Sequence, residues 1–148
     1  IELVSEYVKA WAIAKRKIHP FDQVFLMGKQ LQLEYQFITN GVEHIITDSP
    51  VFLASVYARV YNPDLLDVSK QMESIIAEYD KRHPSLNIVI DRGSYFQQEG
   101  RFHNRKQAEA IDTLIVESLK EKEIPYTSFD ANARGAILKH IKENLNEN

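Results

Sequence analysis

The stretch GVEHIITDSPVFLASVYARV, from Gly41 to Val60, decides how the fold of this chain is predicted. A short apolar run ends in the carboxylate of Asp48, and Ser49 and Pro50 follow before apolar residues recur at helical spacing. The run predicts a buried strand, and Pro50 suits the first turn of a helix, where the missing N–H would have had no partner. Asp48 is then either a cap of that helix, as Ser49 could also be, or a group that handles a metal ion and phosphates.

Strand and helix patterns alternate along the rest of the chain. Apolar segments predict strands at IELVSEY, VEHIIT, LNIVID and IPYTSFD, and amphipathic segments predict helices over residues 20–40, 50–59, 64–82, 106–122 and 131–145. This alternation predicts βαβ units and a mostly parallel sheet. Ligands of such sheets bind beyond the carboxyl ends of the strands. The residues at those ends are Glu6, Asp48, Asp91, Arg92 and Asp130.

Composition is that of an ordinary globular protein. The chain has 148 residues, 44% hydrophobic and 26% charged, which suits one domain with its own core. A net charge of -3 gives no bulk attraction for nucleic acid or anionic membrane, and no apolar run reaches the roughly 20 residues that cross a bilayer. There is no cysteine, and the five histidines lack metal-ligand spacing. We expect a cytoplasmic protein with a small-molecule partner rather than a nucleic-acid or membrane partner, and oligomerisation stays open.

Three segments near predicted strand ends carry a family resemblance. In SEYVKAW, Glu6 precedes Trp11 by five residues; IITDSP is an apolar strand that ends in Asp48; RGSYFQQEGRFHNRKQ is a polar segment with several arginines. They are similar, respectively, to the E-x-x-x-x-W element of deoxynucleoside kinases, to a Walker B strand and to an arginine-bearing lid. The chain thus resembles the P-loop kinases, especially the small nucleoside- and nucleotide-kinase-like ATPases of bacteria and phages. The resemblance implies a three-layer α/β sandwich with a mainly parallel sheet, one domain over residues 1–148, and a lid at about 92–106.

The phosphate loop of this family is missing from the chain. No G-x-x-x-x-G-K-[ST] occurs, since Gly28-Lys29 is followed by Gln30 and position 23 is glutamine. In the resembled family this loop follows strand 1, which is central in the strand order 2-3-1-4-5. Aligning IELVSEY with strand 2 places strand 1, the loop and the first helix upstream of Ile1, where truncation, disorder and a partner chain are the alternatives. The sheet would then have an empty position, about one strand or 4.8 Å wide, between VEHIIT and LNIVID. Direct pairing of these two strands would contradict the hypothesis.

The resemblance assigns roles to residues at and after the ends of the first two predicted strands. Asp48 would hold Mg²⁺ beside the phosphates, and Glu6 would accept the proton of an attacking hydroxyl or position that hydroxyl. The alternatives without a catalytic role are a helix cap for Asp48 and a surface carboxylate paired with Lys9 for Glu6. Trp11 would line the substrate pocket, although a single tryptophan also suits a core.

The predicted lid supplies further candidates. Arg92, Arg101 and Arg105 would contact phosphates, because a planar guanidinium binds phosphate oxygens in bidentate fashion. If the following helix begins early, Arg101 and Arg105 lie one turn apart and can meet one anion. A solvated basic stretch is the alternative. Tyr95 and Phe96 would stack on a base or pack on the core.

Two residues after the last strand complete the predicted site. Asn132 and Arg134 are at the position where the resembled kinases contact adenine, with a plain helix cap by Asp130 or Asn132 as the alternative. His103 is either a phosphate contact or an exposed loop histidine.

The sequence therefore predicts an ATP- and Mg²⁺-dependent phosphotransferase that acts on a nucleoside, a nucleotide or a similar small acceptor. The 148-residue chain alone is expected to be inactive, because the Walker A lysine and its backbone N–H cradle are missing. Two alternatives stay open: a non-catalytic interaction protein with a kinase-like fold, and an ATPase coupled to a partner.

Overall fold

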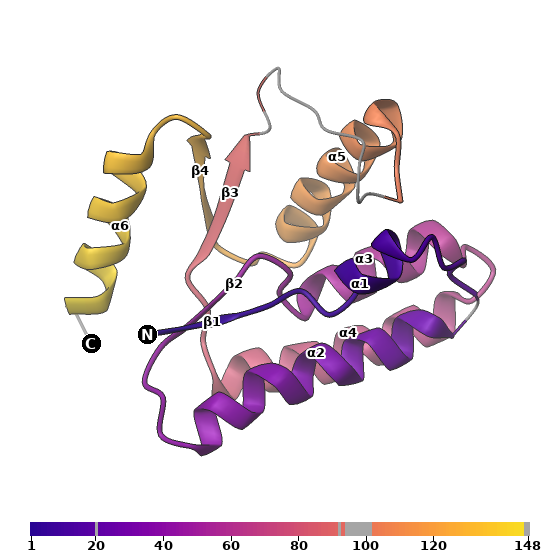
Figure 1. Cartoon of the computed structure of the whole chain (residues 1–148), viewed down its shortest axis with the longest axis horizontal. Helices are drawn as coiled ribbons and strands as arrows, with labels where there is room; N and C mark the ends of the chain where they lie inside the picture. The colour runs from indigo at the N-terminus through magenta and orange to yellow at the C-terminus, as the bar shows by residue number, and fades with distance from the viewer. Residues whose placement is uncertain (20, 92, 94–101, 147–148) are drawn as a thin grey trace.

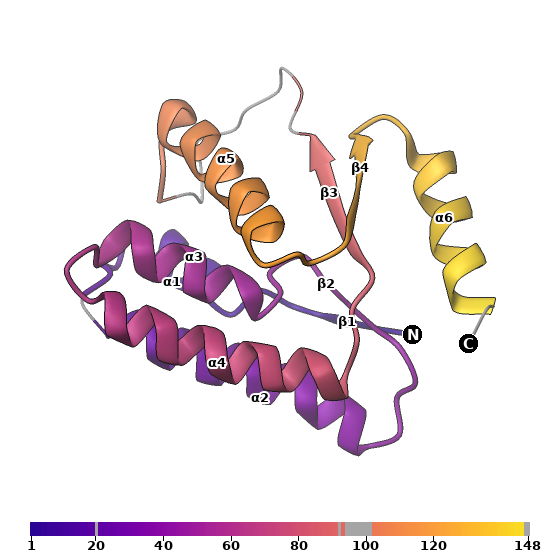
Figure 2. The same ribbon diagram turned by 180° about the vertical axis from the view of Figure 1, so that it is seen from behind.

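The computed structural model describes residues 1–19, 21–91, 93 and 102–146 and has a mixed α/β fold (Figures 1 and 2). Every predicted strand and helix is present, and a short helix, α1, is additional. In chain order the elements are β1 (Glu2–Val4), α1 (Lys9–Ile13), α2 (Asp22–Thr39), β2 (Ile45–Thr47), α3 (Phe52–Tyr61), α4 (Leu66–Arg82), β3 (Asn87–Asp91), α5 (Arg105–Glu121), β4 (Tyr126–Asp130) and α6 (Arg134–Asn146).

The strands form two separate parallel pairs. β1 pairs with β2 from Glu2↔Ile45 to Val4↔Thr47, and β3 pairs with β4 from Asn87↔Tyr126 to Asp91↔Asp130. Within the described residues β2 and β3 do not pair with each other. The direct pairing that would contradict the predicted empty position is therefore not found in this part of the chain.

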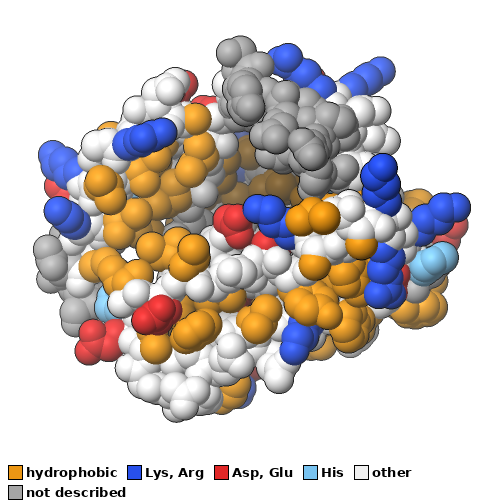
Figure 3. Space-filling model, viewed as in Figure 1, with side chains coloured by type: hydrophobic (Ala, Val, Ile, Leu, Met, Phe, Trp, Pro, Cys, Tyr) orange, Lys and Arg blue, Asp and Glu red, His pale blue; other side chains and the backbone are white. Residues whose placement is uncertain are grey.

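The strands are less buried than their apolar sequences predict. Among the described strand residues only Val4 is buried, while Leu3, Ile46 and Ile90 are exposed. Figure 3 shows hydrophobic side chains gathered on the left of the molecule, around the region of β3, β4 and α6 in Figure 1. The expectation of buried strands is thus wrong for this structure, because each described sheet has two strands and its outer edges carry no further strand.

The hydrophobic core lies among helices rather than around a sheet. α3 packs against both α2 and α4. The buried core side chains are Met27, Val51, Ala58, Met72 and Ile76. Their apolar positions recur at the spacing of one helix face, which explains why these amphipathic segments fold against one another. Of the helices in the described part of the chain, none combines the length and apolar character that a membrane span requires.

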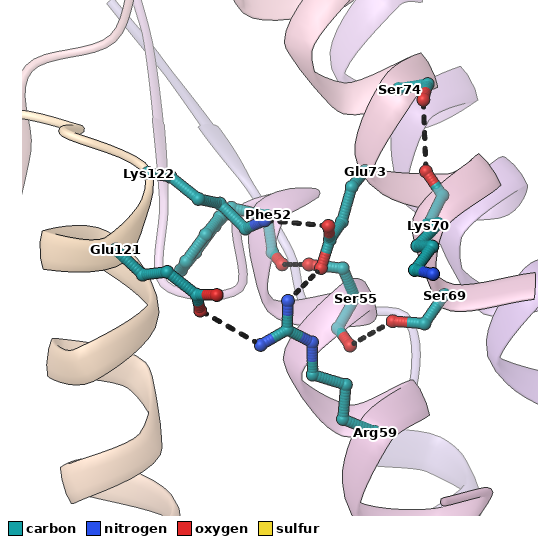
Figure 4. A network of polar contacts seen from close by, with 9 residues as sticks. All are labelled: Phe52, Ser55, Arg59, Ser69, Lys70, Glu73, Ser74, Glu121 and Lys122. Carbon is teal, nitrogen blue, oxygen red and sulfur yellow. Dashed lines mark hydrogen bonds and ion pairs between the residues drawn. The ribbon is translucent and has the colours of Figure 1, made fainter. Parts of the chain in front are cut away.

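A network of ion pairs fixes the C-terminal end of α5 to α3 and α4 (Figure 4). The carboxylate of Glu73 accepts from Arg59 at 2.6 Å and from Lys122 at 2.7 Å, and a second nitrogen of Arg59 lies 3.2 Å from Glu121. Burial alone would raise the pKa of Glu73, but the Lys122 and Arg59 cations lower it overall. The network therefore joins three helices through one ionised carboxylate.

Candidate functional site

A cavity of about 1260 Å³ lies at the carboxyl ends of β1 and β2. Its walls come from α1, the N-terminal half of α2, α3 and α5, together with the segments that follow β1 and β2. Pockets for a single small ligand usually measure roughly 300–1,000 Å³. This cavity is larger than that range.

Glu6 and Asp48, two of the residues predicted to form the site, both line this cavity. Asp48 comes directly after β2, and Glu6 comes two residues after β1. The strands are parallel, with Val4 opposite Thr47, so both chains leave their pair at the same end. The strand pairing thereby brings two carboxylates, distant in sequence, into one cavity.

Asp48 does not cap the helix that follows it. The N-cap position of α3 is Val51, without a side-chain cap, and its first turn is closed by the N–H of Leu53 donating to the carbonyl of Pro50 at 2.9 Å. The N–H of Ser49 donates to the hydroxyl of Thr47 at 3.2 Å. The capping alternative for Asp48 and for Ser49 is therefore wrong.

One wall of the cavity is polar and buried, which the sequence reasoning missed. Gln23 and Gln30 lie seven residues apart on α2 and thus on the same face, and Glu34 continues that face. The amide of Gln30 donates to Glu34 at 3.3 Å and to the Thr47 hydroxyl at 3.4 Å, and its oxygen accepts from the N–H of Tyr7 at 3.5 Å. Burial raises the pKa of Glu34, although the bond from Gln30 opposes this rise.

Gln23 differs from Gln30 in its bonding. It is 4% exposed and lines the cavity, yet the described residues include no hydrogen-bond partner for its side chain. Because Gln23 lines the cavity, a polar ligand or water there can hydrogen-bond to its amide. The signal in the sequence is the presence of glutamines at helical spacing beside the core positions Leu26 and Met27.

Another part of the cavity lining is aromatic. The rings of Tyr57 and His103 stack with centroids 6.0 Å apart and planes 10° apart, and the hydroxyl of Tyr61 lies 2.7 Å from Nε2 of His103. Burial lowers the pKa of His103 and raises that of Tyr61 to about 12, so at neutral pH both groups are uncharged. His103 is half-buried in this stack, and the alternative of an exposed loop histidine is wrong.

Trp11 does not line the cavity but packs behind its wall. Its ring stacks on Phe25 at 5.9 Å and meets the edge of Tyr7, a lining residue, at 6.4 Å. The Arg16 guanidinium lies 3.4 Å from the ring centroid, a cation–π contact. Trp11 thus supports Tyr7 and makes no direct contribution to the cavity surface.

The remaining described candidates lie away from the cavity lining. Arg105 is the first residue of α5 and pairs with Glu109 at 2.8 Å. Asn104 caps that helix, so the early helix start on which a shared anion site of Arg101 and Arg105 depended is not found. The N–H of Asn132 donates to Asp130 at 2.8 Å, and Arg134 begins α6. Asn132 thus belongs to the β4–α6 connection and Arg134 to the first turn of α6.

Four predicted site residues, Arg92, Tyr95, Phe96 and Arg101, lie outside the described residues, as does most of the predicted lid. Of the strand-end residues, Asp91 and Asp130 are opposite each other in the β3–β4 pair and are exposed, but do not line the cavity. The carboxyl ends of β1 and β2 therefore contribute acidic residues to the cavity, whereas those of β3 and β4 do not.

Several lining residues were not candidates at all. The ammonium-bearing side chains of Lys9 and Lys15 come from α1 and the turn after it, and the carboxylate of Asp112 comes from α5. In the described part of the chain there is no group of three or more side chains that could hold a metal ion by themselves. Comparisons of the chain with protein-family models, with curated proteins and with solved structures found no match.

Proposed function

We propose that this chain belongs to a P-loop kinase-like phosphotransferase that moves the γ-phosphoryl group of ATP to a nucleoside, a nucleotide or a similar small acceptor. The observation that carries the proposal is the presence of Glu6 and Asp48 in one large cavity at the carboxyl ends of two adjacent parallel strands. Ligands of parallel sheets bind at such ends. A cavity of about 1260 Å³ is large enough to suit a reaction between a nucleotide and an acceptor.

The carboxylate set of the cavity fits Mg²⁺ only together with a nucleotide. Asp48 is the residue that would hold the ion, because it directly follows β2 and lines the cavity. Mg²⁺ takes oxygen ligands and is commonly bound by one or two carboxylates plus phosphate oxygens and water. When bound, the ion would neutralise charge on the phosphate oxygens.

Glu6 is suited to the acceptor end of the reaction. A carboxylate that reaches an acceptor hydroxyl at about 2.6–3.2 Å can orient it and accept its proton. Gln23 lines the cavity and offers an amide to a ligand, so the same cavity can hold a polar acceptor. Positioning of this kind supplies a large part of the catalysis in phosphoryl transfer.

The open edges of the two sheets support the same proposal. β1–β2 and β3–β4 correspond to strands 2-3 and 4-5 of the resembled order 2-3-1-4-5, and in the described residues neither pair has a third strand. A parallel strand 1 between β2 and β3 would satisfy the backbone groups of both inner edges and cover apolar side chains such as Ile46 and Ile90. The phosphate-binding loop would follow that strand.

Nucleotide binding tests the proposal. Isothermal titration with ATP and Mg²⁺ would be carried out on the 148-residue chain and on a protein that also carries the sequence upstream of Ile1. We expect binding by the longer protein alone, and weakening of about tenfold by Asp48→Asn, the loss expected for one charge-assisted contact. Asp91→Asn is the matched control, since Asp91 is also an exposed strand-end carboxylate but lies outside the cavity lining.

Two outcomes would overturn the proposal. One is the lack of a G-x-x-x-x-G-K-[ST] motif upstream of Ile1, together with no binding of ATP at millimolar concentration. The other is nucleotide binding without phosphoryl transfer to any small acceptor, which favours the non-catalytic interaction protein. Glu6→Gln distinguishes these, because Glu6 lines the cavity: an enzyme loses turnover while it keeps its fold, whereas a non-catalytic protein keeps its binding activity.

A further inference from the structure

Two lysines share the cavity with Glu6 and Asp48. Lys9 is the first residue of α1, Lys15 follows the end of that helix, and both line the cavity. Neither forms an ion pair within the described residues, although three carboxylates, from Glu6, Asp48 and Asp112, line the same space. Their two positive charges are thus available to a ligand.

The backbone at Lys15 is held in an uncommon conformation. Lys15 has φ 52, in the left-handed region where glycine is strongly favoured after a helix. Two hydrogen bonds fix it there: the N–H of Lys15 donates to the carbonyl of Ala12 at 3.1 Å, and the N–H of Arg16 donates to that of Trp11 at 3.0 Å. This is the Schellman pattern with a lysine at the glycine position, and strained residues of this kind cluster at functional sites.

The neighbouring cations of the same basic run have other positions. Arg16 lies over the Trp11 ring and 3.8 Å from Asp22. Lys15 and Lys17 are both exposed, but only Lys15 lines the cavity. The contrast between Lys15 and Lys17 therefore separates a site from a general basic surface.

We propose that the acceptor itself carries a phosphomonoester, which Lys9 and Lys15 bind on the α1 wall of the cavity. The inference rests on the proposed phosphotransferase function and narrows its acceptor from a nucleoside to a small phosphorylated compound such as a nucleotide. A phosphomonoester carries close to two negative charges near pH 7, and lysine ammonium groups bind phosphate as point charges. Two ammonium groups without described ion-pair partners match that charge.

Acceptor binding without ATP tests this inference apart from the proposed function. The 148-residue chain contains both lysines, so it would be titrated calorimetrically with the common 2′-deoxynucleoside 5′-monophosphates and with the parent nucleosides. We expect at least one monophosphate to bind about tenfold or more tightly than its nucleoside, as for one charge-assisted contact. Lys9→Gln and Lys15→Gln should each remove about tenfold of that affinity and leave nucleoside binding unchanged.

Two further variants make the result decisive. Lys17→Gln removes the same charge two residues from Lys15 and should change the affinity by less than about twofold, as expected for a charge outside the cavity lining. Lys15→Gly should lose affinity like Lys15→Gln while its melting temperature rises, because glycine adopts positive φ without strain. Equal affinity for monophosphate and nucleoside, an equal effect of Lys17→Gln, or no binding of any monophosphate at millimolar concentration would overturn the inference. Loss of ATP binding alone would overturn only the proposed function.

Discussion

The substitution Glu73→Gln tests the ion-pair network between α3, α4 and α5. Its carboxylate side chain is 18% exposed and receives contacts of 2.6 Å from Arg59 and 2.7 Å from Lys122, whose side chains are 36% and 24% exposed. Exposed ion pairs contribute about 0.2–1 kcal/mol each, and loss of one partner of a fully buried pair costs about 3–5 kcal/mol. Two partly buried contacts place the expected loss between these limits, at about 2 kcal/mol, or roughly 4–8 °C in Tm.

The pH dependence of this loss identifies its cause. The folded-state pKa of Glu73 is lowered from its ordinary value of 4.5, so its ionisation stabilises the fold above that pH, and the stabilisation disappears as pH falls through the folded-state pKa. The free energy of unfolding should be measured in urea for the unchanged chain and for Glu73→Gln, at pH 7 and below pH 4. The two values should differ strongly at pH 7 and only slightly in acid. Glu78→Gln, which breaks the exposed 2.7 Å pair with Arg82, is the control and should cost at most about 0.5 kcal/mol. A loss at Glu73 no larger than this control, or one that is the same at both pH values, would refute the electrostatic argument.

Three other substitutions have defined outcomes. Met72→Ala removes a side chain that is 1% exposed in the core among α2, α3 and α4, and should cost about 2–5 kcal/mol in urea unfolding, whereas a cost below about 1 kcal/mol would contradict that position. Asn104→Ala removes the N-cap of α5, which accepts from the N–H of Gln107 at 2.9 Å, and should lower stability by about 1 kcal/mol; an unchanged Tm would contradict the capping box. Glu34→Gln should raise stability at pH 7 by roughly 1 kcal/mol, because the raised folded-state pKa of Glu34 means that its ionisation disfavours the fold as pH rises. That gain should shrink toward pH 4, and a gain independent of pH would contradict burial of the charge.

The regular elements were predictable because their signals are local. The predicted helix over residues 64–82 is observed as Leu66–Arg82, and the predicted strand LNIVID as Asn87–Asp91. The helix α1 was not predicted, because a segment of five residues is too short to define a helical period. Strand burial was wrongly predicted. A continuous apolar run indicates a strand inside a sheet that is covered on both faces, whereas the strands of the described chain form two separate pairs.

The cavity was predictable only in part. Glu6 and Asp48 were found because parallel strands bring their carboxyl ends together, a rule that needs only the order of the elements. Gln23, Tyr57 and Lys15 were missed, because each lies on a helix or turn whose orientation depends on packing between distant segments. Trp11 was predicted to line the substrate pocket, but it packs on Phe25 and does not line the cavity. The motif gives the spacing between Glu6 and Trp11, but not which face of a short helix meets the core.

The free edges of the strand pairs also govern how copies of the chain behave at high concentration. An edge strand with unpaired N–H and C=O groups is a template for any other extended chain, including a second copy of itself. β2 and β3 have such edges within the described residues, and the adjoining apolar side chains of Ile46 and Ile90 are exposed. The 148-residue chain should therefore aggregate by edge-to-edge pairing as its concentration rises, and a polypeptide that occupies these edges should act as its solubilising subunit or segment.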